Sequence, residues 1–187
     1  MKTHPQVAKD LEAALGNRAV LWRPEDLLVY EYDGTIDRGT PEVIAFPKNA
    51  NEVSATIKIA RQHRLPVTPR GAGTGLSGGA LATRGGVVIA MNRMRRILEI
   101  DVENRTALVE PGVVNLDLGR AAAPHGLAYA PDPSSQRACT IGGNVAENAG
   151  GPHTLAYGTT TNHVLALEIV TADGKIHWLG GPTRDVP

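Results

Sequence analysis

Hydrophobic positions recur every three or four residues in three segments of the chain, a spacing that predicts amphipathic helices. The segments cover residues 4–15, 50–64 and 114–123. The first repeat ends at Gly16 and the third at Gly126. Glycine commonly terminates a helix because it adopts the left-handed backbone conformation without strain. We therefore expect at least three helices distributed along the whole chain.

The predicted helix over residues 50–64 carries the clearest start signal. Asn49 precedes it and Glu52 follows three residues later, which is the spacing of a capping box. Its buried face is predicted to consist of Val53, Ile57 and Ala60. Shorter helical turns are predicted to begin at Pro24 and to cover residues 144–148.

Short apolar runs bounded by glycine, proline or charged residues predict strands and hairpins. Single strands are expected at 42–46, 66–69 and 86–91, and hairpins at 97–102 with 106–110 and at 164–171 with 175–179. The chain breaks at Pro111-Gly112, which suggests two lobes. We predict an α+β fold of two α/β lobes, in which mixed strands have flanking helices. The expected parts are an N-terminal helical segment over 1–40, one subdomain over 41–110 and another over 111–187.

Composition narrows the possible functions. The 187 residues are 42% hydrophobic and 20% charged, as in soluble globular proteins. Nineteen basic residues balance nineteen acidic ones, so no long-range field favours nucleic acid, and only 4% of residues are aromatic. No apolar run approaches the ~20 residues that span a bilayer, and no secretory signal is visible, so a cytoplasmic location is expected.

Five glycines occur within nine residues in a segment that we call the glycine loop, residues 71–79. Its sequence is Gly71-Ala72-Gly73-Thr74-Gly75-Leu76-Ser77-Gly78-Gly79. Such a run leaves a row of backbone N–H groups without side chains in front of them, which favours phosphate binding. A flexible linker is the alternative, but apolar runs at 66–69 and 86–91 flank the loop on both sides.

Two familiar nucleotide-binding patterns do not fit the glycine loop. The residues from Gly73 to Gly78 match the GxGxxG pattern, but a Rossmann fingerprint requires a helix that begins inside the loop. The following stretch up to Gly85-Gly86 is too short and too rich in glycine for one. No Lys-Ser or Lys-Thr follows the glycines, which excludes a P-loop. A loop between two strands that binds a diphosphate through successive N–H groups remains.

Side chains at the glycine loop add candidate contacts. Arg70 is the one cation beside it and could meet a phosphate or close a surface ion pair. The hydroxyl groups of Thr74 and Ser77 are expected to contact the ligand, although they could instead satisfy the turn.

A second glycine-rich region begins with Cys139-Thr140-Ile141-Gly142-Gly143-Asn144 and continues through Gly150-Gly151 and Gly158. Together with Glu110-Pro111-Gly112 and Pro131-Asp132-Pro133-Ser134-Ser135, this series resembles the FAD-binding domain of the vanillyl-alcohol oxidase type, also called the p-cresol methylhydroxylase type. The similarity is greatest to the branch that contains the FAD-linked glycolate oxidase and D-lactate dehydrogenase. It extends from about Pro41 to Gly181.

The resemblance implies FAD as cofactor, with its pyrophosphate on the glycine loop and its ribityl chain and ring along 131–135 and 140–144. It implies that the N–H groups of Gly142 and Gly143 face the ring; helix capping is the alternative role for Asn144 and Asn148. The implied cofactor-binding positions are Arg70, Gly71, Ala72, Gly73, Thr74, Gly75, Leu76, Ser77, Gly78, Pro111, Gly112, Pro131, Asp132, Pro133, Ser134, Ser135, Thr140, Gly142, Gly143, Asn144, Asn148, Gly150, Gly151, Gly158 and Ile169.

Some members of the family attach the flavin covalently through a histidine beside the pyrophosphate loop. The glycine loop contains no histidine, so we expect noncovalent FAD. Cys139 is expected to be a small buried thiol rather than an attachment site. His153 and His163 border the implied pocket but are expected to be structural, and no histidine spacing predicts a metal site.

The resemblance further implies an oxidoreductase that moves a hydride from C2 of a small 2-hydroxy acid to the flavin. The catalytic base and the carboxylate-binding cation would lie outside this chain, so no catalytic residue is predicted here. The chain alone is then expected to be inactive. Electron-transfer or iron–sulfur subunits are the expected partners, and these could hold the protein at the inner face of a membrane. A stand-alone nucleotide-binding or subunit-binding module without turnover is the alternative.

Overall fold

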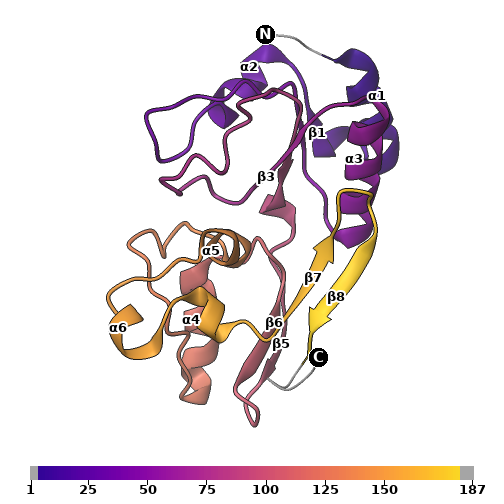
Figure 1. Ribbon diagram of the computed structural model, residues 1–187. Coiled ribbons are helices and arrows are strands. Elements are labelled where there is room, and N and C mark those ends of the chain that lie inside the picture. Colours follow the sequence, from indigo (N-terminus) through magenta and orange to yellow (C-terminus); the bar gives the residue numbers. More distant parts are fainter. Residues whose placement is uncertain (1–3, 182–187) are drawn as a thin grey trace. The chain divides into compact units, whose positions relative to one another are not determined.

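The computed structural model describes residues 4–181 and groups them into two compact units (Figure 1). Unit 1 contains the chain up to Arg93 together with the chain from Leu165 onward. Unit 2 contains Met94–Val164. Both units mix helices with strands, which confirms the predicted fold class. None of the helices in this described part of the chain is long and apolar enough to cross a membrane.

The centre of unit 1 is a four-stranded sheet in the order β1-β2-β4-β3. The two inner strands, β2 and β4, are parallel to each other, β3 is parallel to β4, and β1 is antiparallel to β2. The strands are β1 (Val20–Leu21), β2 (Val43–Ala45), β3 (Val67–Arg70) and β4 (Val87–Ala90). Every residue of β2 and β4 is buried, as expected of parallel strands that are covered on both faces.

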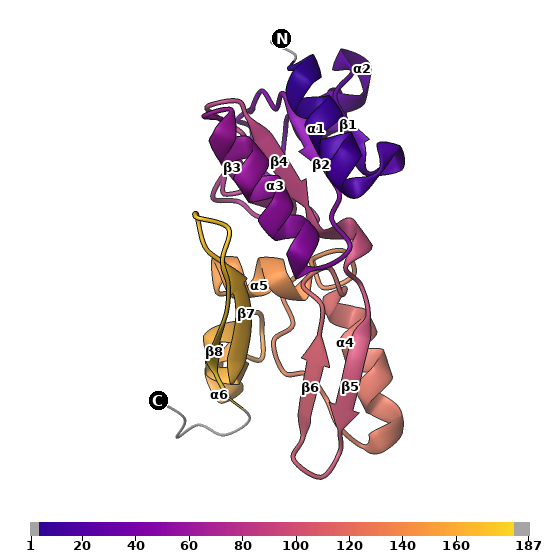
Figure 2. The ribbon, with the colours of Figure 1, turned by 90° about the vertical axis from the view of Figure 1, so that its right-hand side faces the viewer.

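Alternate residues of these strands pack into two separate clusters. Val43 and Val87 pack with apolar residues of α1 (Pro5–Leu15) and α3 (Ala50–Gln62), the two helices that lie side by side in Figure 2. Ile44 and Val88 point to the opposite face, where Leu27 at the end of α2 (Pro24–Leu27) joins them. Single 3-10 turns complete this part of the chain: η1 (Asn17–Ala19), η2 (Leu28–Tyr30) and η3 (Met91–Arg93).

The start of α3 confirms one half of the predicted capping box. Oδ1 of Asn49 accepts a hydrogen bond from the N–H of Glu52 at 2.9 Å. The carboxylate of Glu52 accepts in turn from the N–H of Lys48, also at 2.9 Å, rather than from that of Asn49. The reciprocal bond is therefore displaced by one residue, and an ion pair between the same carboxylate and Nζ of Lys48 accompanies it.

The C-terminal hairpin belongs to unit 1. It consists of β7 (Ala166–Val170) and β8 (Ile176–Gly180), close to the predicted bounds. The buried hydroxyl of Ser54 on α3 donates to the carbonyl oxygen of Gly174 in the hairpin turn at 2.5 Å. Gly174 has φ +78°, and a Cβ there would lie 2.7 Å from Cγ of Lys58. The hairpin turn is thus closely packed on α3.

Unit 2 begins with the predicted hairpin of β5 (Ile97–Asp101) and β6 (Thr106–Val109). Its helices are α4 (Asn115–Ala122), α5 (Ile141–Glu147) and α6 (Thr154–Tyr157), with 3-10 turns η4 (Ala123–His125) and η5 (Thr160–His163). Gly126 follows η4 with φ +70°, which confirms it as the stop of the α4 segment. A single bridge pairs Val114 with Thr140.

The two compact units divide at Arg93/Met94 and not at Pro111-Gly112. The reason is local pairing across the hairpin, because Gly112 N donates to Met94 O at 2.7 Å and Glu110 N donates to Arg96 O at 2.9 Å. A division into cofactor-binding subdomains at 110/111 stays a prediction.

We expect the α1–sheet contact to contribute strongly to the stability of unit 1. Leu11 is fully buried in the first cluster, so Leu11→Ala is expected to lower the free energy of unfolding by about 2–5 kcal/mol. Urea denaturation measures this. Leu155, which is 99% exposed, serves as control, and Leu155→Ala should stay within about 0.5 kcal/mol of wild type. Equal effects of the two substitutions would contradict this packing.

Candidate functional site

The glycine loop follows the carboxyl end of β3, at the edge of a parallel sheet where ligands commonly bind. Between residues 4 and 181, no protein acceptor receives a hydrogen bond from the backbone N–H groups of residues 72–76. These residues are half-buried or exposed. Five successive donors therefore have no acceptor among the described residues, and their role in phosphate binding stays a prediction.

Glycine is required at two positions of this loop. Gly73 has φ +68° and Gly78 has φ +75°, backbone conformations that residues with a Cβ rarely adopt. A Cβ on Gly73 would also collide with the guanidinium of Arg70. The backbone at Gly73 thus lies directly against the Arg70 side chain.

Arg70 is buried and does not form a surface ion pair within residues 4–181, and its guanidinium is engaged by carbonyl oxygens. It is 9% exposed. Its Nη2 donates to the carbonyl oxygen of Tyr32 at 2.8 Å, and its Nη1 lies 3.4 Å from that of Ala80. The guanidinium carbon lies 5.6 Å from the centre of the Tyr30 ring. Burial lowers the pKa of Arg70, and the nearby charge of Asp33 partly opposes this shift.

The hydroxyl-bearing residues of the loop differ in what surrounds them. The half-buried side chain of Thr74 makes no hydrogen bond within the described residues 4–181, which leaves its hydroxyl open to a ligand. Ser77 does have an interaction partner. Between these two residues, the Leu76 side chain is 79% exposed.

In unit 2, the structure brings together two of the predicted segments. Gly151, with φ +137°, is packed so closely on Asp132 that no Cβ could be accommodated. The backbone N–H of His153 donates to Oδ1 of Asp132 at 3.1 Å. The ring Nδ1 of His153 lies 3.1 Å from Oδ2 of the same Asp132. The segment 131–135 is thereby attached to the start of α6, and His153 has the structural role that we predicted.

Gly142 and Gly143 lie inside α5 and not in a loop before it, since the helix begins at Ile141. The N–H of Gly142 donates to Pro111 O at 2.8 Å, and that of Gly143 donates to Oγ1 of Thr140 at 3.2 Å. Both donors are therefore already paired within the protein, and the contact of these glycines with a flavin ring stays a prediction. A Cβ on Gly142 would lie 2.7 Å from Cβ of Pro111, so close packing explains this glycine.

The two asparagines of this region differ. Asn144 is 2% exposed, and its Nδ2 has no hydrogen-bond partner. A second buried atom without a partner is Oγ1 of Thr154. Asn148 instead ends α5 at φ +49°, and its Oδ1 accepts from the N–H of Thr161 at 3.0 Å. Helix capping therefore accounts for Asn148, whereas the Asn144 amide has an unused donor.

Four further residues singled out in the sequence have identifiable surroundings. Gly158, at φ +81°, ends α6 against the side chain of Asn162. Ile169 lies in β7 of unit 1, where it pairs with His177. Cys139 is a buried free thiol, as predicted. His163 has its Nε2 3.0 Å from the carbonyl oxygen of Tyr157. Over residues 4–181, no group of three or more His, Cys, Asp or Glu side chains is arranged to hold a metal ion.

The sequence analysis missed one segment that contacts the glycine loop. The N–H of Gly34 donates to Gly75 O at 3.1 Å, and Oδ2 of the neighbouring Asp33 is buried without a partner. The pair Asp33-Gly34 is a typical turn signal. This local signal indicates a turn only and does not indicate a contact with Gly75, which lies 41 residues further along the chain.

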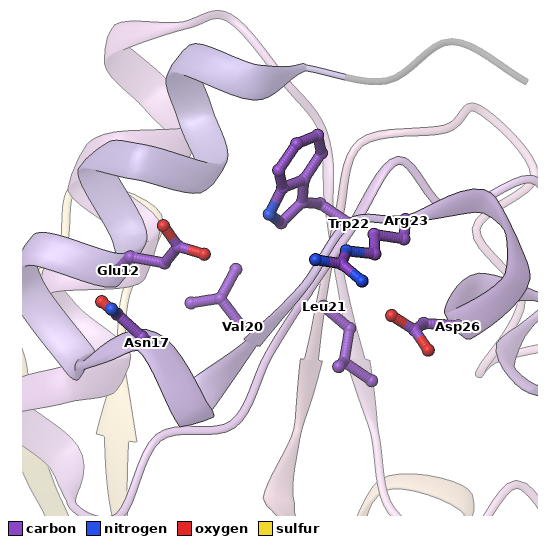
Figure 3. A pocket seen from close by; sticks show the side chains of 7 residues that line it. All are labelled: Glu12, Asn17, Val20, Leu21, Trp22, Arg23 and Asp26. Carbon is purple, nitrogen blue, oxygen red and sulfur yellow. The ribbon is translucent and has the colours of Figure 1, made fainter.

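Unit 1 also has a polar pocket of about 280 Å³ where α1, β1 and α2 meet (Figure 3). Glu12 and Asn17 lie on one side, the Trp22 ring stands above, and Arg23 and Asp26 lie on the other side. Val20 and Leu21 form the rest of the lining. None of these residues belongs to the predicted cofactor site.

Comparison with known proteins identifies one family. Residues 41–180 match the family model described as FAD binding domain. The chain is 48% identical over 169 residues to the glycolate oxidase subunit GlcD of Escherichia coli K12, covering 90% of this chain and 34% of that protein. It is 45% identical over 159 residues to the D-lactate dehydrogenase of Archaeoglobus fulgidus, covering 82% and 35%.

A solved structure of alkyldihydroxyacetonephosphate synthase superposes with a TM-score of 0.83 at 21% identity, covering 96% of this chain and 34% of that one. At this identity, the similarity concerns the fold alone. The chain spans about a third of the length of each of these relatives.

We expect one ion pair of the 110–112 segment to make unit 2 sensitive to acid. The carboxylate of Glu110 is 7% exposed and accepts from N, Nε and Nη2 of Arg96 at 2.7, 3.0 and 2.7 Å. Burial alone would raise the pKa of Glu110, but the Arg96 hydrogen bonds and charge outweigh it, so the net pKa lies below the ordinary 4.5. This stabilisation is therefore present above pH 4.5 and is lost as the pH falls through the lowered pKa.

Accordingly, Glu110→Gln should lower the free energy of unfolding by about 1–3 kcal/mol at neutral pH. Urea titrations should show that the difference from wild type narrows as the pH falls through the lowered pKa of Glu110. A difference that is constant with pH would show that the charge of Glu110 is not responsible.

Proposed function

Because the chain belongs to the FAD-binding domain family over residues 41–180, we propose that it is the FAD-binding part of a flavin-dependent dehydrogenase or oxidase. The proposed substrate of the whole protein is a small 2-hydroxy acid of the glycolate or D-lactate type. The names of the relatives that share 45–48% of its residues support this choice. Since those relatives are about three times as long, turnover is proposed for a protein that contains the further parts and not for these residues alone.

The row of five open N–H groups in residues 72–76 carries this proposal. A hydrogen bond to a charged oxygen contributes about 1.5–3 kcal/mol. Several such bonds are enough to hold a diphosphate without a lysine, and the loop contains none. Thr74 would add a hydroxyl donor from the same loop. The pyrophosphate of FAD is the group that this loop is proposed to bind.

Unit 2 is proposed to contact the flavin end of the cofactor through residues 131–135 and through Asn144. The buried Nδ2 of Asn144 has no acceptor in the protein, and leaving a buried donor unpaired costs about 1–3 kcal/mol. A carbonyl or ring nitrogen of a bound flavin would satisfy it. When bound, FAD supplies the hydride acceptor, while the residues of this chain bind and orient it.

Attachment of the cofactor is proposed to be noncovalent, because the glycine loop has no histidine and the Cys139 thiol is buried. Electron-transfer subunits are the proposed partners, in line with the name of the Escherichia coli relative, which describes it as a subunit.

Thermal unfolding with added flavins tests the proposal. Ligand at a hundred times its dissociation constant stabilises the native state by about 2.7 kcal/mol. FAD should raise the unfolding temperature, whereas riboflavin, which lacks the diphosphate, should have much less effect at equal concentration. Equal stabilisation by FAD and riboflavin would contradict the proposal that the glycine loop binds the diphosphate. No stabilisation by FAD would contradict the proposed function.

We expect Gly73→Val to abolish FAD binding. A Val side chain is strained at φ +68° and would collide with Arg70, so the loop would change shape. Gly119→Ala is the matched control, because nothing lies within 4 Å of a Cβ there. Equilibrium titration of both variants by flavin fluorescence gives the comparison. Unchanged affinity of the Gly73 variant would show that the loop conformation does not matter for binding.

A further inference from the structure

A second loop of unit 1 lies against the glycine loop. We call it the bracing loop, residues 31–39. Its ends are joined, since the N–H of Gly39 donates to Glu31 O at 2.6 Å. Its turn is held by Asp33, whose Oδ1 accepts from the N–H of Thr35 at 2.8 Å. The bracing loop is thus a closed structure with its own internal bonds.

The contact between the two loops fixes the direction of a peptide group. Gly34 N–H donates to Gly75 O at 3.1 Å. In a planar trans peptide, the C=O and the following N–H point in opposite directions. The bond from Gly34 therefore turns the N–H of Leu76 away from the bracing loop, toward the side where no described residue accepts it.

This contact leaves no room for a side chain at Gly34. A Cβ there would lie 2.7 Å from Gly75 O and 3.0 Å from Thr74 O. These are backbone atoms, which cannot yield as the end of a side chain can. Even alanine at position 34 would push the two loops apart.

Arg70 connects the same two loops from inside. Its Nη2 donates to Tyr32 O of the bracing loop at 2.8 Å, and its Nη1 lies 3.4 Å from Ala80 O, just after the glycine loop. Its guanidinium also packs against Gly73, where it would collide with a Cβ. At 9% exposure, it supports the loop from within. The planar guanidinium reaches the two carbonyl oxygens with two different nitrogen atoms, whereas an ammonium has all of its donors on one nitrogen.

We propose that Arg70 and Gly34 are positioning residues that brace the glycine loop, so that its N–H row is already aimed before a diphosphate binds, and that Arg70 does not itself ligate phosphate. This inference rests on the proposed function for the identity of the ligand. Its physical basis is that a loop ordered in advance does not lose conformational freedom on binding.

A double-mutant cycle separates bracing from direct ligation. Gly34→Ala and Arg70→Met are each expected to weaken FAD binding about tenfold or more. If both residues act through one loop–loop contact, the FAD dissociation constant of the double variant should lie within about threefold of that of the single variant that binds FAD less tightly. Arg70→Lys should lose as much affinity as Arg70→Met. Losses that multiply in the double variant, or retained affinity in the lysine variant, would overturn the proposal in favour of a phosphate ligand.

A matched control removes an arginine without touching the brace. Arg84 is exposed and takes part in no ion pair among the described residues 4–181. Arg84→Met removes the same charge and is expected to change FAD affinity by less than about twofold. A loss equal to that of Arg70→Met would show that charge and not bracing is responsible.

The brace can also be tested without FAD. In protein labelled with [15N]glycine, Arg70→Met should shift the amide signals of Gly34 and Gly75, and Gly34→Ala should shift those of Gly73 and Gly75. The Gly119 signal should stay in place. If Arg70→Met does not fold, Gly34→Ala alone decides the result. Unshifted loop signals overturn the brace. Shifted signals in the variants, together with a wild-type protein that does not bind FAD, support the brace and refute the proposed function.

Discussion

Five backbone N–H groups between Ala72 and Leu76 find no acceptor within residues 4–181, so this part of the loop must be held in shape by other means. Three constraints supply this. The loop starts at the end of β3, which pairs with the fully buried strand β4. Gly73 and Gly78 permit backbone angles that other residues resist. The buried guanidinium of Arg70 supports the loop from inside.

Apolar residues pack on both faces of the sheet in unit 1. Helices α1 and α3 cover one face of the sheet, and α2 contributes Leu27 to the other. In unit 2, two of the predicted cofactor segments are connected by the contacts of Asp132 with Gly151 and His153. In unit 1, the backbone N–H groups of residues 72–76 have no acceptor among residues 4–181. In unit 2, the side-chain Nδ2 of Asn144 has no hydrogen-bond partner. Both arrangements leave polar groups without a partner among residues 4–181.

The sequence was sufficient to predict features that depend on nearby residues. Helical periodicity predicted α1 and α3, and alternating apolar runs predicted both hairpins and the strands beside the glycine loop. Features that depend on distant partners were not predictable. The two-residue β1 is too short to give a pattern. Helix α5 begins at Ile141, before the predicted 144–148. Its Gly142 N–H donates to Pro111 O, which lies 31 residues earlier in the chain. Arg70 owes its burial to Tyr30 and Tyr32, which no local pattern relates to it.

The most direct test of the central claim is to observe the amides of the glycine loop while a flavin binds. In [15N]glycine-labelled protein, FAD should shift the signals of Gly73 and Gly75 strongly, because their N–H groups acquire charged acceptors, and riboflavin should leave them nearly unchanged. FAD that binds tightly without moving these signals would contradict the account, since the diphosphate would then lie elsewhere.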